Sequence, residues 1–238
     1  MSRTLLGLDR LPATAARAVP AWICPLRPEG DSPIFADAKI GTVPSLRGPA
    51  AGLPSPPRGI LLDACNVLYD DTAWRRWLLR VLDRLGLRTT YGCFFHVLAR
   101  DYLDDVYCGR RSLGEALGDY LRSVGLSVGQ INEVTTALGS YRRSTEDHAR
   151  PLTRVRQTLR QLRAMGLTLG VLSNTEIPGP GLRERLDRLF APPLLTAVVS
   201  SRDLGRAMPD PACYAAALAA LGLPAASVAF VGHDAAEL

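Results

Sequence analysis

Apolar residues along most of the chain recur with one of two periods, and these periods predict where helices and strands form. Over residues 72–87, apolar side chains fall at i, i+3, i+4 and i+7 with arginines between them, which predicts an amphipathic helix. Helical patterns continue to about residue 150, and capping-box matches at Ser112 and Ser127 each begin a new apolar periodic run. No segment in this stretch has the pattern of a strand, so an all-helical region is expected.

Four short apolar runs predict strands that are separated by helices. The runs cover residues 60–62, 167–172, 196–199 and 227–231. Such an alternation implies right-handed crossovers and an α/β fold with a doubly wound parallel sheet, in which we expect the first strand to be central. Chemistry in such sheets collects at the carboxyl ends of the strands. The residues expected in one crevice there are Asp63, Ser173, Asn174, Ser200, Ser201 and residues 232–234.

The first 57 residues show neither period. They are rich in Pro, Gly and Ala and end in GPAAGLPSPP, which is typical of a mostly disordered extension, with only a weak strand pattern at 34–40. The domain organisation that we expect is an extension at 1–57, an α/β core made of 58–69 and 151–238, and a helical region at 70–150.

Charge and cysteine content exclude several classes of protein. The net charge of +5 comes almost wholly from arginine, since Lys39 is the only lysine. The arginine pairs lack the interleaved aromatic residues of single-strand binders, so we expect solvated faces and no nucleic-acid partner; the pairs are Arg75-Arg76, Arg110-Arg111 and Arg142-Arg143. No apolar run reaches the ~18 residues of a membrane span. Five cysteines without disulfide-like or metal-like spacing favour a reducing, cytoplasmic location.

Four phrases of the sequence resemble the motifs of the haloacid dehalogenase (HAD) superfamily, in the subgroup with a helical cap inserted after the first strand. They are LLDACNVLYDD, AMGLTLGVLSN, SSRDLGRAMPDPACYAAALAALGLP and SVAFVGHDAAEL, and the match runs from about Arg58 to Leu238. The resemblance implies that Asp63 is a nucleophile that forms a covalent intermediate and that Ser173 and Asn174 donate hydrogen bonds to the transferred group. It also implies a Mg²⁺ ion, with Asp63, Asp234 and Glu237 as its ligands.

Three positions depart from this family pattern. Phosphatases of the superfamily carry a general acid two residues after the nucleophile, where this chain has Cys65, and a lysine where it has Met208. His233 takes the place of the first acidic residue after the fourth strand, which leaves the Mg²⁺ site incomplete. Cys65, Arg206 and His233 are the expected substitutes for the lost groups, and Asp70 is a further candidate for the acid. Met208 is expected to pack in the pocket wall.

The resemblance and the departures leave two functions open. One is a phosphatase-type hydrolase that acts through Asp63 on a small phosphorylated metabolite with weak or altered activity; the other is a non-catalytic binding or scaffolding module. A metal-independent haloacid dehalogenase is a weaker third reading. We expect little or no Mg²⁺-dependent phosphatase activity from the unmodified chain, and the motifs do not indicate the substrate or the oligomeric state. Because the sequence stops at Leu238, within the fourth motif, we expect a fragment or a truncated product.

Overall fold

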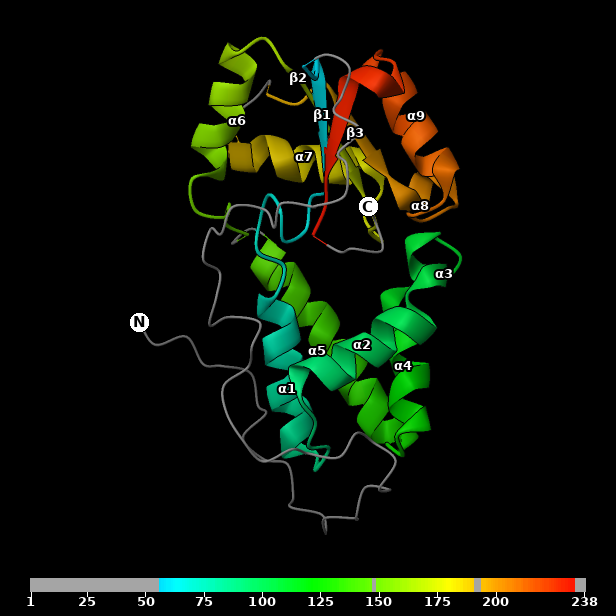
Figure 1. The fold of residues 1–238 in the computed structure, drawn as a ribbon. Coiled ribbons are helices and arrows are strands. Elements are labelled where there is room, and N and C mark those ends of the chain that lie inside the picture. The colour runs from blue at the N-terminus through cyan, green and yellow to red at the C-terminus, as the bar shows by residue number, and fades with distance from the viewer. Residues whose placement is uncertain (1–55, 147–148, 191–193, 234–238) are drawn as a thin grey trace, which may run out of the picture.

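The computed structural model describes residues 56–146, 149–190 and 194–233, which form a sheet-containing core and a separate bundle of helices (Figure 1). The strands of the core are β1 (Gly59–Leu62), β2 (Thr168–Ser173), β3 (Ala197–Ser200) and β4 (Val228–Val231). They form one sheet in the order β3-β2-β1-β4, and every neighbouring pair is parallel. The predicted strands are therefore confirmed to within one residue at each end, and β1 lies inside the sheet as expected.

Helices cover both faces of the sheet. α6 (Val155–Ala164) and α7 (Gly179–Phe190) pack on one face, where Leu159 and Leu186 are buried against Val171. α9 (Pro211–Leu221) packs on the other face, and Gly170 of β2 allows a close approach there, since a Cβ atom would lie 2.9 Å from Leu221 Cδ1. The core is thus an α/β fold with a doubly wound parallel sheet, as the alternation of helices and strands predicts.

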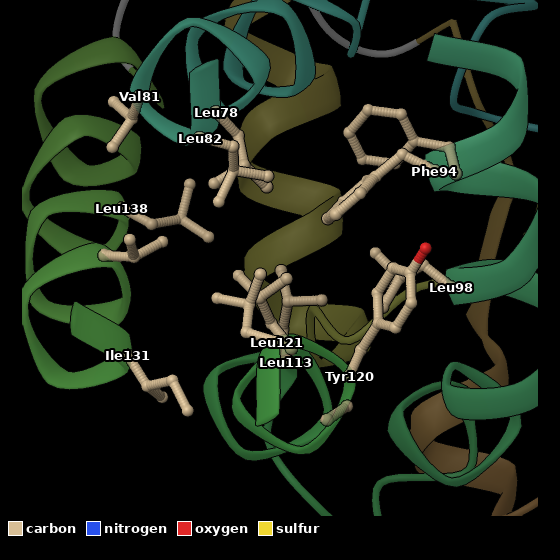
Figure 2. Close-up of a cluster of buried hydrophobic side chains, with 14 of the residues drawn as sticks. Leu78, Val81, Leu82, Phe94, Leu98, Leu113, Tyr120, Leu121, Ile131 and Leu138 are labelled. Carbon is tan, nitrogen blue, oxygen red and sulfur yellow. The ribbon is translucent and has the colours of Figure 1, made fainter. Parts of the chain in front are cut away.

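The helical bundle is inserted between β1 and β2. Its helices are α1 (Ala73–Arg84), α2 (Tyr91–Tyr102), α3 (Asp104–Tyr107), α4 (Leu113–Ser123) and α5 (Val128–Glu146). They enclose an apolar core of their own, in which Leu78, Leu98 and Leu121 are fully buried (Figure 2). No strand occurs among the described residues of this insert. In the described part of the chain, no helix is long and apolar enough to cross a membrane.

Local sequence signals explain where two of these helices begin. At the start of α4, Ser112 Oγ accepts a hydrogen bond from the backbone N–H of Glu115, and the Glu115 carboxylate accepts one from the backbone N–H of Ser112 at 2.7 Å. This is the predicted capping box. At α9, Asp210 Oδ1 accepts from the backbone N–H of Ala212, and Pro211 occupies the first helical position.

A hydrogen bond and an ion pair are among the contacts that join the helical insert to the core. Ser201 Oγ of the short helix α8 (Ser201–Leu204) donates to the carbonyl of Tyr107 at 2.8 Å. Arg142 of α5 forms an ion pair with Glu176, which follows β2. The insert therefore faces the carboxyl ends of the strands and encloses a space between the two parts of the molecule (Figure 1). Apart from residues 56 and 57, the predicted extension at 1–57 lies outside the described residues.

Candidate active site

The Asp63 carboxylate, directly after β1, is held by groups from three segments. Its Oδ1 accepts a hydrogen bond from the backbone N–H of Ala64 at 2.7 Å and from Ser173 Oγ at 2.5 Å. Nδ1 of His233 lies 2.8 Å from Oδ2, and because an ionised carboxylate only accepts hydrogen bonds, this nitrogen is the donor. Ser173 and His233 are 110 and 170 residues away in sequence. They meet Asp63 because β1, β2 and β4 are adjacent and parallel.

A pocket of about 440 Å³ lies over Asp63, between the core and the helical insert. Asp63 is 2% exposed and Ser173 is fully buried behind it. A volume of this size suits a small molecule. The core contributes Asp63, Cys65, Asn174, Met208 and His233 to the lining, and the helical insert contributes Trp74, Arg75, Phe95, Tyr107 and Arg142.

Cys65 lines this pocket at the position where the family pattern places the general acid. Its Sγ lies 3.4 Å from the hydroxyl of Tyr69, a fully buried side chain. Burial raises the pKa of the Cys65 thiol far above its usual value, and nearby carboxylates raise it further. A thiol with so high a pKa is a poor proton donor to a phosphate ester. The chemical environment of Cys65 therefore does not favour it as a replacement for the missing acid.

Asn174 and Met208 hold each other in place on the core side of the pocket. The Asn174 side chain donates from Nδ2 to the carbonyl of Met208 at 3.1 Å and accepts from its backbone N–H at 2.8 Å. Met208 is 5% exposed and packs with Leu172 and Cys213 while it also lines the pocket. The amide of Asn174 thus positions the Met208 segment, and its hydrogen bond to a substrate stays a prediction.

Other predicted residues do not line the pocket. Arg206 is paired with Asp210 at 2.7 Å, has a 60% exposed side chain and lines a neighbouring hollow behind Met208. The Ser200 hydroxyl donates to the carbonyl of Ile177, and the Ser201 hydroxyl holds the helical insert, so both have structural contacts instead of facing the crevice as expected. Asp234 and Glu237 lie outside the described residues.

The described donor groups around Asp63 do not fit a Mg²⁺ site. Mg²⁺ prefers six oxygen ligands, whereas the side chains hydrogen-bonded to Asp63 are an imidazole and a hydroxyl. Both carboxylate oxygens already accept hydrogen bonds, and the Cys65 thiol also lines the pocket. Across residues 56–146, 149–190 and 194–233, no three His, Cys, Asp or Glu side chains are grouped so that they could hold a metal ion. We therefore derive no chemical step from Mg²⁺.

The helical wall of the pocket carries charged residues that motif reasoning did not identify. Asp71 is 21% exposed, and its Oδ2 accepts a hydrogen bond from Trp74 Nε1 at 3.1 Å and lies 3.9 Å from a nitrogen of Arg75. The guanidinium groups of Arg75 and Arg142 each lie 5.4 Å from the Trp74 ring centre, so the indole is flanked by two cations.

The expectation of solvated faces is wrong for two of the paired arginines. The side chains of Arg75 and Arg142 are only 21% and 20% exposed, and both line the pocket. By contrast, Arg110 is 64% exposed, as a solvated face predicts. No local sequence signal separates these cases, because the burial of Arg75 and Arg142 depends on how the insert docks on the core.

Comparison with known proteins places this geometry in a family. The family described as haloacid dehalogenase-like hydrolase matches residues 57–238. A glyceraldehyde 3-phosphate phosphatase from Methanocaldococcus jannaschii is 26% identical over 181 residues, which cover 74% of this chain and 75% of the relative.

Solved structures share the fold of the described residues. A predicted phosphoglycolate phosphatase from Haemophilus somnus 129PT has a TM-score of 0.52 and 18% identity, over 74% of this chain and 76% of that one. The L-2-haloacid dehalogenase RSc1362 also has a TM-score of 0.52, with 24% identity over 75% and 78% of the two chains. The match of the family over residues 57–238 shows that the chain belongs to the haloacid dehalogenase-like hydrolases.

Proposed function

We propose that this protein hydrolyses a small phosphate monoester, with Asp63 as the nucleophile. The observation that carries the proposal is the placement of Asp63, a buried carboxylate at the carboxyl end of an interior strand that faces a pocket large enough for a metabolite. The name of the curated relative refers to glyceraldehyde 3-phosphate, a small ester of this class.

In the proposed first step, Asp63 Oδ2 attacks phosphorus and displaces the alkoxide of the ester. The product on the protein is an aspartyl phosphate at Asp63. Ser173 Oγ and the Ala64 N–H both donate to Oδ1, so they fix the rotation of the carboxylate. His233 donates to Oδ2, beside the expected position of the phosphoryl group. Because a hydrogen bond to the attacking oxygen reduces its nucleophilicity, we expect slow turnover.

Arginines in the pocket lining support an anionic substrate. Arg75, Arg100, Arg142 and Arg185 all contribute to the walls. Acidic side chains also line the pocket, and Arg142 forms an ion pair with one of them, Glu176. The pocket lining therefore carries both positive and negative groups, and it suits a ligand that has hydroxyl groups as well as a phosphate.

The helical insert is proposed to act as the cap of the site. We assign residues 70–150 to this cap, 58–69 together with 151–238 to the catalytic core, and 1–57 to an extension. The pocket is lined from both cap and core, so the cap excludes water from Asp63 and selects the substrate.

Carbon–halogen hydrolysis is a second candidate, because the displaced halide needs no proton. That reaction therefore does not need an acid at position 65. Phosphate ester hydrolysis does need one, and the Cys65 thiol is a poor proton donor because its pKa is raised. A non-catalytic binding module is the remaining candidate, and the reciprocal hydrogen bonds that lock Asn174 onto Met208 favour it.

The test measures inorganic phosphate released from a panel of phosphate monoesters, with Mg²⁺ and with a chelator, and halide released from 2-chloropropionate. We expect slow phosphate release from the unmodified protein and none from Asp63→Asn. Mass spectrometry after an acid quench should detect a phosphoryl group on the peptide that contains Asp63. Release of halide alone would favour the dehalogenase, and ester binding without turnover would favour the binding module.

A further inference from the structure

Phosphate ester hydrolysis in this pocket requires a proton for the leaving oxygen, and His233 on the core wall is already hydrogen-bonded to Asp63 Oδ2 at 2.8 Å. Asp63 is used as the nucleophile in the proposed function, and burial makes Cys65 a poor acid. The remaining carboxyl groups that line the pocket are Asp71, Asp104 and Glu176. The proton donor can therefore be sought among these three.

Two of the three have contacts or positions that disfavour the role. Glu176 forms an ion pair with Arg142, which holds it at the junction of cap and core. Asp104 is exposed at the start of α3 and also borders the hollow behind Met208. An exposed carboxyl group at the edge of the pocket is a poor candidate for proton transfer to a bound ester.

Asp71 differs from both in its surroundings. Its side chain is largely buried, one oxygen accepts from the Trp74 indole, and the nearest cationic nitrogen, on Arg75, is 3.9 Å away, beyond hydrogen-bond distance. Asp71 also lines the same pocket as Cys65, the residue at the position of the missing acid.

We infer that Asp71 is the general acid and base of this site, in place of the carboxyl group that the chain lacks at position 65. The inference rests on the proposed function, because it needs an ester that is attacked by Asp63. It assigns a catalytic residue to the cap side of the pocket, eight positions after the nucleophile.

The electrostatic surroundings of Asp71 agree with this role. Burial raises the pKa of Asp71, while Arg75, the Trp74 indole and Arg142 lower it and Glu176 raises it. These groups come from α1, from α5 and from the segment after β2, and Cys65, from the segment after β1, lines the same pocket. A raised pKa keeps more of the carboxylic acid form available near neutral pH, as proton donation requires.

The proposed reaction has two steps, and Asp71 transfers a proton in each. Asp63 Oδ2 forms a bond to phosphorus, the bond from phosphorus to the ester oxygen breaks, and the Asp71 carboxylic acid gives its proton to that oxygen to yield an alcohol. Asp71, now a carboxylate, then accepts a proton from a water molecule that attacks phosphorus. The bond between Asp63 and phosphorus breaks, which releases inorganic phosphate and restores both side chains.

The test compares esters that differ in their leaving group. An alkyl phosphate such as glycerol 3-phosphate needs a proton on its leaving oxygen, whereas 2,4-dinitrophenyl phosphate does not. We expect Asp71→Asn to lower kcat for the alkyl ester by about 10²- to 10⁴-fold and to leave the first step with the dinitrophenyl ester little changed. Burst kinetics measure that first step separately.

Asp70→Asn is the matched control. Asp70 is the exposed neighbour of Asp71, does not line the pocket, and accepts from Thr72 N at 2.8 Å and from Thr72 Oγ1 at 2.6 Å. Asparagine can retain both contacts, so this variant should match the unmodified protein with both esters. This position also argues against Asp70 as the substitute acid that the sequence suggested.

A measurement on the unmodified protein covers the case in which Asp71→Asn does not fold. With the alkyl ester, kcat should fall as pH rises through the pKa of Asp71, and with the dinitrophenyl burst this basic limb should be absent. Identical pH profiles for both esters, or an Asp71→Asn variant with unchanged alkyl turnover, would overturn the role of Asp71 while Asp63→Asn still abolished activity. Equal phosphate release by unmodified protein and Asp63→Asn would overturn the proposed function and this inference together.

Discussion

The two walls of the pocket are built in different ways. On the core wall, Asp63 has three hydrogen bonds of 2.5–2.8 Å to groups at the ends of neighbouring strands or in its own turn. On the cap wall, Asp71 and Arg75 are about one-fifth exposed and lie 3.9 Å apart. Backbone register therefore fixes the side of the proposed nucleophile, whereas the docking of helices sets the side that we propose to handle the proton.

Because the two walls are built differently, substitutions on them are expected to have different effects. The end of a parallel strand is held by hydrogen bonds to both neighbours, so its geometry changes little when the cap moves. The contacts between the cap and the core include Arg142 with Glu176 and Tyr107 with Ser201. Substitutions on the core wall should thus affect the chemical step, and substitutions at the cap should affect docking and proton transfer.

The largest effect on the core wall, after loss of Asp63 itself, is expected from Ser173→Ala. This change removes the 2.5 Å donor to Asp63 Oδ1 and leaves that buried oxygen with the Ala64 N–H alone. We expect kcat to fall by about 10²-fold, by analogy with the loss of one positioned donor. Steady-state kinetics would measure this. Ser200→Ala is the control, since Ser200 is an equally buried strand-end hydroxyl that bonds to Ile177; a similar kcat loss there would contradict the assignment.

The ion pair between the two walls can be tested by a double-mutant cycle on Arg142 and Glu176. The pair is largely buried, with side chains 20% and 24% exposed, so we expect a coupling of about 1–2 kcal/mol in the free energy of unfolding. Urea unfolding of Arg142→Gln, Glu176→Gln and the double variant gives the value. The exposed pair Arg188 and Glu184 should show a coupling below about 0.5 kcal/mol. Equal coupling energies would mean that the pair of Arg142 and Glu176 contributes no more to the free energy of unfolding than a surface ion pair does.

A change inside the cap but away from the pocket should affect stability alone. Ser112→Ala removes the cap of α4 and is expected to cost about 1 kcal/mol of unfolding free energy, while Ser112→Asp should retain most of it. Thermal unfolding reports the difference. Because Ser112 does not line the pocket, kcat should stay unchanged, and a coupled loss of activity would show that cap folding and the site are not separable.

The smallest effect concerns the pH dependence of stability. The raised pKa of Asp71 means that the folded state holds this proton more tightly than the unfolded state, so the group contributes stability at low pH that is lost as pH rises through the folded pKa. Asp71→Asn should therefore unfold at higher denaturant concentration than the unmodified protein at neutral pH, and the gap should close at pH values below the unfolded pKa. A variant less stable at neutral pH would show that the ion pair with Arg75 outweighs burial.

Several elements follow from the sequence because their causes are local. The capping box of α4 needs only Ser112 and Glu115. Helix α9 has Asp210 as its N-cap and Gly222 as its C-cap, and the φ of 71° at Gly222 suits a residue without a Cβ atom. The strands could be predicted because short apolar runs alternated with amphipathic helices. The meeting of Asp63, Ser173 and His233 also follows, since parallel neighbours place their carboxyl ends together.

The cap wall was decided by tertiary structure. Asp71 and Arg75 have the i,i+4 spacing of helical neighbours, but no spacing links them to Arg142 on α5 or to Glu176 after β2. Arginines on amphipathic helices are usually solvated. Their burial depends on the angle at which α1 and α5 approach the sheet, which results from side-chain packing across the whole insert. The sequence by itself therefore determined the fold and the place of Asp63, the proposed nucleophile, whereas long-range packing determined which side chains line the opposite wall.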